Sequence, residues 1–371
     1  MPLYLTEDQV MLRDTARPFV AAEGAIAKEL RRLRDSGCSD GFGHSLWKQF
    51  GEMGFTGILI DEADGGLGLG HVEAGIVLEE IGRNLTPSPF LISAVAFVEA
   101  VKRTALRERW FPGILAGETV AAIALDEGPK HRPEGIAMRA ERWGNGFRLS
   151  GRKQFVVQGA SADVTLVAAR TDEGVTLFAV EKGANGLEVE GVRLADSSIG
   201  ARMTFDGVEV DADAVVGEVG GGEAILSRLL AAGRAGAASE LVGVGSAAMD
   251  MTVDYLKQRK QFGRLIGEFQ ALQHRSAHLY AELEIARAAT LKAQQLLDEG
   301  AAEAEAMVSV AKAKAGRASQ LAVQESVQMH GGIGMTDEYD IGLYMKRERV
   351  LDELFGDPAY HAERLARLKG Y

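Results

Sequence analysis

The hydrophobic pattern of this chain changes its period twice, which limits the folds that it can adopt. Up to about residue 117, apolar side chains recur every three or four residues, as in amphipathic helices; Leu46, Phe50 and Met53 have this spacing. From Thr119 onward the pattern alternates in short runs typical of strands, and from Gly220 the helical period returns. The sequence therefore predicts a helical domain at residues 1–117, a β-domain at 118–219 and a helical bundle at 220–371.

Local signals place several helices. Thr6 and Gln9 have the spacing of a capping box, in which each side chain bonds the backbone amide of the other, so a helix is expected to begin there. Further helices are predicted at residues 71–83 and 91–102, separated from the preceding helix by a glycine-rich turn at residues 61–70. In the last domain, an apolar stripe predicts packing in a four-helix bundle; it comprises Leu241, Val244, Ala248, Met251 and Tyr255.

One later helix carries three cations, Lys312, Lys314 and Arg317, which are expected to lie largely off its apolar side. In the β-domain, the pairs Asn145-Gly146 and Asp206-Gly207 are expected to form turns, because glycine readily adopts the positive φ of tight hairpins. The predicted strands make an antiparallel barrel or sandwich, with strands at residues 119–125, 136–140, 147–149, 153–157, 164–169, 175–180 and 187–192.

Composition excludes several classes of function. The net charge of −12 disfavours nucleic acid and anionic membranes as partners, because both attract basic surfaces. Cys38 is the only cysteine, so an intrachain disulfide and a thiolate metal site are excluded and a reducing compartment is indicated. The chain begins with Glu7 and Asp8 where a signal peptide would be basic, and no apolar run has the length of a membrane span. We expect a cytoplasmic protein without a metal site.

Two segments of the bundle carry motifs. Residues 259–274 read RKQFGRLIGEFQALQH, which offers a guanidinium for phosphate, a phenyl face for stacking and amides for polar contacts. Residues 328–336 read QMHGGIGMT, in which glycines allow a ligand to approach the backbone. These segments resemble the RxxFGxxIxxFQxxQH and QxxGGxGxT motifs of the acyl-CoA dehydrogenase family, and the order helices, β-domain, bundle resembles its fold along the whole chain.

The resemblance implies an oxidoreductase that uses FAD to oxidise the α,β bond of an acyl-CoA thioester and passes electrons to an acceptor flavoprotein. It implies that the ADP half of FAD binds across a subunit boundary, and hence an oligomer. Carried over by position, Arg259 pairs with the pyrophosphate. The other implied cofactor-binding residues are Gln261, Phe262, Ile266, Gln270, Gln328, Gly331 and Gly332.

The catalytic base of the family is missing from both of its usual positions. The glutamate that would precede Arg234 is Gly233, and the glutamate of the carboxy-terminal YEGT motif is Phe355. Neither side chain can accept a proton. Asp357 is the nearest substitute, although its position before a proline favours a turn residue, and Glu240, two helical turns from Gly233, is a poorer candidate.

The flavin cradle of the family is altered too. Its LTEP and GSD segments are replaced by Leu125-Asp126-Glu127-Gly128 and residues 129–133, and its KxWIT segment by residues 153–157, which lack the tryptophan and the threonine hydroxyl. We expect a subunit that contributes the ADP-binding half of an FAD site to a homologous partner in a heteromer, similar to the small subunits ending in FGD. The alternatives are a self-sufficient homomeric dehydrogenase with a relocated base and a catalytically silent scaffold.

Overall fold

The computed structural model describes residues 3–371. Its contacts divide the chain into two compact units, and the long helix α7 (Gly222–Gln258) contributes residues to both. Unit 1 comprises residues 3–31, His71–Thr86 and Arg234–Tyr371, and unit 2 comprises Arg32–Gly70 and Pro87–Gly233. The three domain boundaries expected from the sequence remain a prediction.

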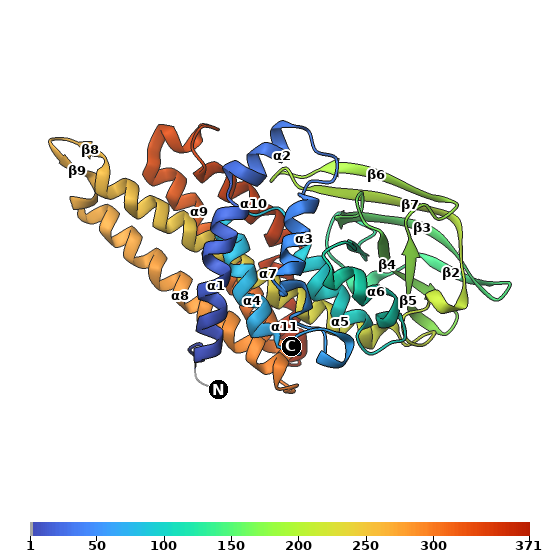
Figure 1. Ribbon diagram of the computed structural model, residues 1–371. Coiled ribbons are helices and arrows are strands. Elements are labelled where there is room, and N and C mark those ends of the chain that lie inside the picture. Colours follow the sequence, from blue (N-terminus) through green and yellow to red (C-terminus); the bar gives the residue numbers. More distant parts are fainter. Residues whose placement is uncertain (1–2) are drawn as a thin grey trace. The chain divides into compact units, whose positions relative to one another are not determined.

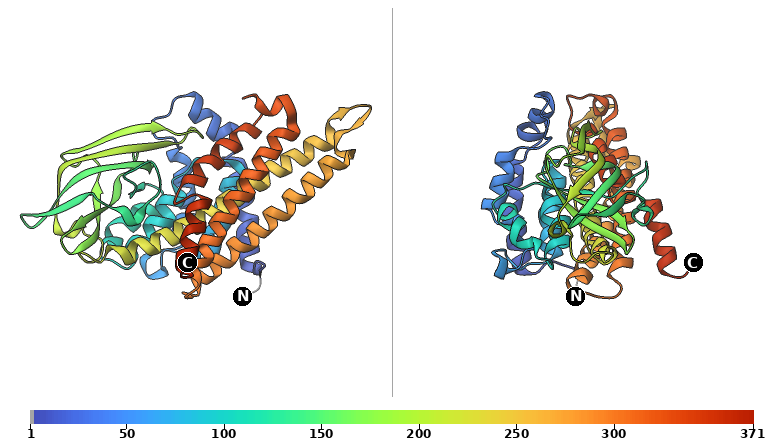
Figure 2. Two further views of the ribbon diagram at one scale, coloured as in Figure 1. Left: turned by 180° about the vertical axis from the view of Figure 1, so that it is seen from behind. Right: turned by 90° about the vertical axis from the view of Figure 1, so that its right-hand side faces the viewer.

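Unit 1 is built of helices (Figures 1 and 2). Besides its part of α7, the unit contains α1 (Glu7–Glu23), η1 (Ala27–Arg31), α4 (His71–Asn84), the strands β8 (Lys260–Gln261) and β9 (Arg264–Leu265), η7 (Ile266–Glu268), α8 (Gln270–Asp298), α9 (Ala304–His330), η8 (Gly331–Met335), α10 (Ile341–Glu353) and α11 (Pro358–Leu368). Helix α8 packs against α9 and α4, helix α1 packs against α4, and α9 also contacts α10 and α11.

The local signals in this unit act as expected. The Thr6 hydroxyl accepts a hydrogen bond from the Gln9 amide, and the Gln9 side chain accepts one from the Thr6 amide, so the capping box is confirmed. Leu241 and Val244 of the predicted stripe on α7 are fully buried. Glycine allows α4 to approach α7 closely, because a Cβ atom built on Gly82 would lie 2.2 Å from the carbonyl oxygen of Glu240.

The prediction for Lys312 was wrong. Its side chain is fully buried within unit 1, and its ammonium group donates hydrogen bonds to the carbonyl oxygens of Asp352 and Gly356, each at 3.0 Å. A helical wheel treats lysine as a surface residue, whereas here backbone carbonyls at the end of α10 provide polar partners inside the protein.

Unit 2 combines short helices with one seven-stranded sheet. The β-domain expected from the sequence is confirmed, and its core is a cluster of apolar side chains that includes Phe147, Phe178 and Met203. The helices are α2 (Arg32–Asp35), α3 (His44–Glu52), η2 (Phe55–Gly57), η3 (Glu62–Asp64), η4 (Phe90–Phe97), α5 (Val98–Val101), α6 (Leu106–Leu115), η5 (Pro133–Gly135) and η6 (Ala212–Ala214). The helix predicted at 91–102 is therefore a π-helical segment followed by an α-helical turn.

The sheet has the strand order β1-β4-β2-β3-β7-β6, with β5 paired to β4. Its strands are β1 (Ala121–Ala124), β2 (Arg139–Trp143), β3 (Gly146–Val157), β4 (Val164–Thr171), β5 (Gly174–Glu181), β6 (Leu187–Arg193) and β7 (Ile199–Val210). The two strands predicted at 147–149 and 153–157 are one continuous strand, β3.

Two details of the sheet differ from the prediction. First, β1 pairs with β4 in parallel, because the β2–β3 hairpin intervenes along the chain and lets β4 return in the direction of β1. Second, the Asp206-Gly207 pair is not a turn between strands; it lies inside β7, a strand that the sequence did not predict. Gly207 has φ 64°, and the pairing with β3 shifts register between Leu149 and Gly151, so this pair forms a bulge.

Among the described residues, no helix is long and apolar enough to cross a membrane.

Candidate functional site

The hairpin between α7 and α8 carries most of the residues that the sequence assigned to FAD. Its strands β8 and β9 pair at the far end of these two helices, and the hairpin projects beyond them (Figure 1). Phe262 and Gly263 form the tip with φ of 53° and 79°, and the Phe262 ring is 89% exposed. Phe269 meets the Phe262 ring edge-on at 6.2 Å and lies 4.1 Å from the Arg264 guanidinium, so the tip presents an ordered aromatic face.

The polar side chains of this hairpin are available to a ligand. Arg259, Gln261 and Gln270 are all exposed, and none of their side chains has a partner within the described part of the chain. Ile266 is the exception in the predicted set, because it is buried and packs in the base of the hairpin. An exposed guanidinium without a carboxylate partner can bind a phosphate without first breaking an ion pair.

The second motif forms an open backbone segment at the end of α9. Gln328 is exposed, and the chain then turns at Gly331, which has φ 65°. No described atom lies within 4 Å of a Cβ built on Gly331 or Gly332, so a ligand can approach this backbone.

His330, between these residues, is buried rather than exposed to a ligand. Its ring stacks on Tyr255 at 4.5 Å and contacts Tyr339 at 4.9 Å. Burial lowers the pKa of His330, so the ring is neutral at physiological pH and packs as an aromatic group.

The loop between α10 and α11 holds the residues assigned to the missing base. Phe355 is buried and has φ 61°. Asp357 is the N-cap of α11, and its carboxylate accepts a hydrogen bond from the Tyr360 amide at 2.8 Å. Glu240 is buried on α7. One of its carboxylate oxygens accepts hydrogen bonds from Nε of Arg347 at 2.8 Å and from a terminal nitrogen of Arg347 at 2.5 Å. Each carboxylate therefore already has a structural partner.

The β-domain contains a second buried cluster of charges, on the segments that replace the flavin cradle. Lys153 is fully buried and donates to Glu127 at 2.8 Å and to the Leu125 carbonyl at 3.1 Å. The imidazole of His131 lies 3.1 Å from both oxygens of Asp126. Burial lowers the pKa of Lys153, partly offset by Glu127.

Burial opposes ionisation of Glu127, but hydrogen bonds from Lys153 and from the amides of Met138 and Ala137 outweigh it, and the pKa of this carboxyl is lowered. Lys153 thus links β3 to the loop after β1 through its bonds to Glu127 and the Leu125 carbonyl.

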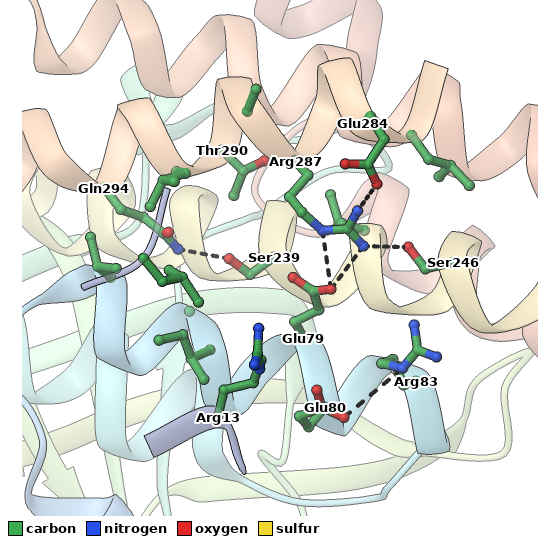
Figure 3. A pocket seen from close by; sticks show the side chains of 18 of the residues that line it. Arg13, Glu79, Glu80, Arg83, Ser239, Ser246, Glu284, Arg287, Thr290 and Gln294 are labelled. Carbon is green, nitrogen blue, oxygen red and sulfur yellow. Dashed lines mark hydrogen bonds and ion pairs between the residues drawn. The ribbon is translucent and has the colours of Figure 1, made fainter. Parts of the chain in front are cut away.

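A separate cavity of about 540 Å³ lies within unit 1 (Figure 3). Its walls come from α1, α4, α7 and α8, and apolar side chains such as Ile76, Val242 and Leu283 line part of it. At one end the Gln294 amide donates to Ser239 at 2.7 Å. The cavity has the size of a small-molecule site, but its charged groups bind one another.

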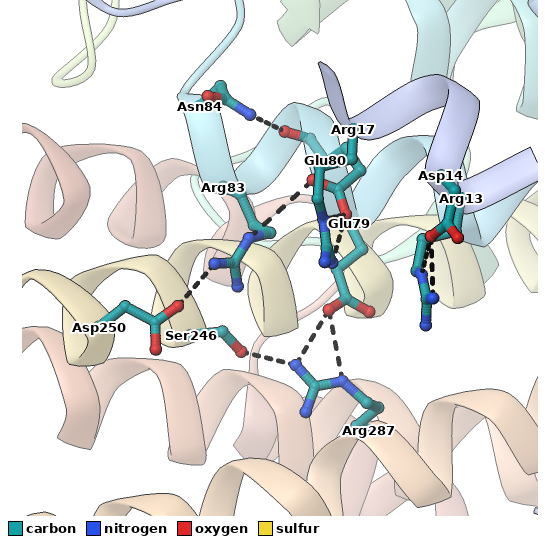
Figure 4. Close-up of polar contacts among 10 residues, drawn as sticks. All are labelled: Arg13, Asp14, Arg17, Glu79, Glu80, Arg83, Asn84, Ser246, Asp250 and Arg287. Atoms are coloured by element: carbon teal, nitrogen blue, oxygen red, sulfur yellow. Dashed lines mark hydrogen bonds and ion pairs between the residues drawn. The ribbon is translucent and has the colours of Figure 1, made fainter. Parts of the chain in front are cut away.

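The ion pairs of this cavity form two chains (Figure 4). Arg287 of α8 donates to Glu79 of α4 at 2.9 Å and to Ser246 of α7 at 2.9 Å. Glu80 accepts from Arg17 at 2.9 Å, and Arg83, which lies 3.9 Å from Glu80, donates to Asp250 at 2.6 Å. These contacts crosslink four helices, so the network stabilises the unit.

Sequence reasoning missed the His131–Asp126 pair and the buried Lys312. The residues were visible as departures from a motif, but nothing in the sequence indicated that the imidazole and carboxylate five positions apart would meet. Lys312 could have been suspected only because its neighbours on α9, Ala311 and Ala315, are small and fully buried.

Comparison with known proteins identifies the fold and its class. The chain matches the family descriptions "Acyl-CoA dehydrogenase, N-terminal domain" at residues 6–118, "middle domain" at 130–208 and "C-terminal domain" at 220–369. It is 31% identical over 326 residues to mitochondrial isovaleryl-CoA dehydrogenase of Solanum tuberosum, which covers 83% of this chain and 78% of that protein.

Two solved structures are similar along nearly the whole chain. One is a variant of the Tcur3481-Tcur3483 steroid ACAD, with 30% identity, a TM-score of 0.89 and 98% of each chain covered. The other is the ChsE4-ChsE5 complex from Mycobacterium tuberculosis, with 26% identity, a TM-score of 0.91 and 100% of each chain covered.

The chain therefore belongs to the acyl-CoA dehydrogenase family, whose members are FAD-dependent oxidoreductases acting on CH–CH bonds. The residues of the ADP half fit the cofactor, because an exposed guanidinium without a partner and an open glycine backbone suit its phosphates. The β-domain segments fit the flavin ring less well, since Val157 offers no hydroxyl and Lys153, Glu127, Asp126 and His131 bond one another.

Proposed function

We propose that this chain is the non-catalytic member of a heteromeric acyl-CoA dehydrogenase and contributes the ADP-binding half of an FAD site completed by a homologous subunit. FAD supplies the hydride acceptor when it is bound. In this chain Arg259 binds the pyrophosphate, Phe262 and Gln270 contact the adenosine, and the Gly331-Gly332 backbone approaches the phosphates. The exposed state of these groups is the observation that carries the proposal.

Two features of the chain support the division of labour between unlike subunits. The position of the base is occupied by Phe355, whose buried side chain cannot accept a proton. Asp357, the nearest carboxylate, caps α11, and removing it from that role would cost the helix its cap. The partner would supply the glutamate, the flavin cradle and the substrate thioester site.

The comparisons favour this class of assembly. Two relatives of similar fold, Tcur3481-Tcur3483 and ChsE4-ChsE5, are each named as a pair of chains, and the first is a steroid ACAD. By analogy we propose a bulky acyl-CoA as the substrate class of the heteromer. An electron-accepting flavoprotein and a cytoplasmic location complete the proposal.

A self-sufficient homomer is the second candidate, because Asp357 lies only two residues from the expected base and the ADP-side residues are intact. In that enzyme Asp357 would remove the α-proton, and Asp357→Asn would lower turnover at least a hundredfold, as loss of a general base does. Full turnover of this variant would exclude Asp357 as the base.

The deciding experiment measures FAD per chain. We expect the chain expressed alone to purify with little FAD, and the complex with a glutamate-bearing homologue to contain FAD and oxidise acyl-CoA. In that complex Arg259→Ala should weaken FAD binding at least tenfold, since a charge-assisted bond to phosphate is worth about 1.5–3 kcal/mol. The matched control is Lys257→Ala, an exposed lysine at the end of α7.

The other outcomes are equally informative. One FAD per chain with turnover in the absence of any homologue would establish the homomer. FAD content and turnover that stay unchanged in Arg259→Ala would mean that this chain serves the complex only as a scaffold.

A further inference from the structure

The loop at residues 354–357, between α10 and α11, has an unusual backbone. Phe355 and Gly356 are consecutive residues with positive φ, at 61° and 107°. A Cβ atom built on Gly356 would lie 2.4 Å from a ring carbon of Tyr360, so glycine is required there. Positive φ at a phenylalanine costs free energy and persists only where surrounding contacts fix the backbone.

Two buried cations make those contacts, and they come from different helices. Arg234 of α7 donates from Nε to the Phe355 carbonyl at 3.1 Å and from a terminal nitrogen to the Tyr360 hydroxyl at 3.0 Å. Lys312 of α9 donates to the Gly356 carbonyl and to the Asp352 carbonyl, both at 3.0 Å. Adjacent carbonyls of the loop are thus each held by a cation.

The charge of Lys312 is balanced at a distance and not by a direct ion pair. Glu348 and Asp352, both buried on α10, attract it, as does Asp357, while Arg234 repels it. Within the described residues, Glu348 Oε1 and Asp352 Oδ1 are buried without a hydrogen-bond partner. Burial lowers the pKa of Lys312 to about 8 and, together with Asp352, raises that of Glu348 to about 7.

We propose that Lys312 is the positioning residue of the 354–357 loop and that its proton controls how firmly the loop is held. The inference rests on the proposed function in one respect only: that function makes this loop relevant, because the loop contains Phe355, which stands at the position of the family's catalytic base. Lys312 lies on α9, more than forty positions before this loop in the chain.

The two carbonyl contacts hold the loop, whereas burial of the charged ammonium opposes this closed state. Because burial lowers the pKa of Lys312 to about 8, below that of a lysine in water, a loop opening that hydrates the ammonium is most frequent while Lys312 is protonated and becomes rarer as the pH rises above about 8. The strain at Phe355 favours this opening, since its positive φ relaxes when the carbonyl of the next residue is released.

The neighbouring charges set the pH at which this happens. Carboxylates at Glu348 and Asp352 favour the protonated lysine, so replacing Glu348 by glutamine should move the change to lower pH. On α10, Arg349 and Glu353 influence the pKa values of these carboxylates. The pKa of Arg234 is influenced by Tyr360 and Arg364 of α11 and by Glu305 of α9. His361, the next residue of α11, is also fully buried.

The test is hydrogen exchange of the full-length protein between pH 6.5 and 9.5, followed by mass spectrometry of a peptide spanning residues 353–361. Rates are corrected for intrinsic exchange and compared with a peptide from the middle of α8. We expect the corrected rate of the loop peptide to fall at least fivefold between pH 8 and pH 9.5, while the α8 peptide is constant.

Three variants sharpen the test. Lys312→Met has no ammonium to titrate, so its corrected rate should not depend on pH, and Lys314→Met, on the same helix but paired with Glu282, should match the wild type. Glu348→Gln keeps Lys312 in place, so it remains informative even if Lys312→Met fails to fold, and its fall should begin at lower pH than in the wild type.

The proposal is overturned by a loop peptide whose corrected rate is constant or rises across the pH range, or by an unchanged onset of the fall in Glu348→Gln. Exchange is measured without FAD or a partner subunit, so a negative result leaves the half-site proposal untouched. Conversely, failure of Arg259→Ala to affect FAD binding would leave the exchange result unaffected.

Discussion

The buried ion pair of the β-domain provides the sharpest prediction for stability. Replacing Lys153 by methionine keeps an unbranched side chain, one atom shorter, and removes the ammonium that bonds Glu127 and the Leu125 carbonyl. Removing one partner of a buried pair costs about 3–5 kcal/mol. Two effects reduce this figure. Glu127 is 22% exposed and still accepts hydrogen bonds from the amides of Ala137 and Met138, and the variant no longer pays the free-energy cost of burying an ammonium group. We expect a loss of about 2 kcal/mol.

The assay is urea unfolding of the full chain at pH 7, followed by tryptophan fluorescence. Trp47, Trp110 and Trp143 all lie in unit 2 with Lys153, so the signal reports the affected unit. The control is Glu173→Gln, which breaks an exposed surface pair with Arg142 and should leave the midpoint unchanged.

The pH dependence gives a second check on the same variant. The pKa of Glu127 is lowered in the folded state, so its contribution to stability is present above the ordinary carboxyl pKa and is lost as the pH falls through the lowered value. The difference between wild type and Lys153→Met should therefore shrink in acid. A variant as stable as the wild type at pH 7, or a difference that does not depend on pH, would refute the reasoning.

Three further predictions follow from particular contacts. Glu348→Gln should stabilise the protein by about 3 kcal/mol above pH 7 and not at all at pH 4. The pKa of Glu348 is raised to about 7, so the wild-type protein loses stability when this carboxyl ionises as the pH rises through this value. Equal unfolding midpoints of the two proteins at pH 8.5 would contradict the prediction. Gly82→Ala should cost about 3 kcal/mol through the clash with the Glu240 carbonyl, whereas Gly128→Ala, with no atom within 4 Å, should be neutral in the same urea titration. Thr6→Ala should cost about 1 kcal/mol and increase hydrogen exchange in the first turn of α1 only; unchanged exchange there would show that the capping box is dispensable.

The sequence by itself determined the features that depend on local patterns. The capping box at Thr6, the helix at residues 71–83 and most strands of the sheet follow from period, turn residues and spacing. The two motifs of the bundle indicated the family by resemblance, and the domain matches agree with it. Such patterns involve residues that are close in the chain, so they can be recognised in the sequence without knowledge of the fold.

Tertiary structure decided the rest, because the deciding partners are distant in sequence. The Asp206-Gly207 pair became a bulge only because β3 pairs with β7, and β1 became parallel to β4 only through a crossover. Lys312 is buried because carbonyls forty and forty-four positions away accept its hydrogen bonds. A charge can leave water only where such partners assemble, and their assembly is a property of the folded chain.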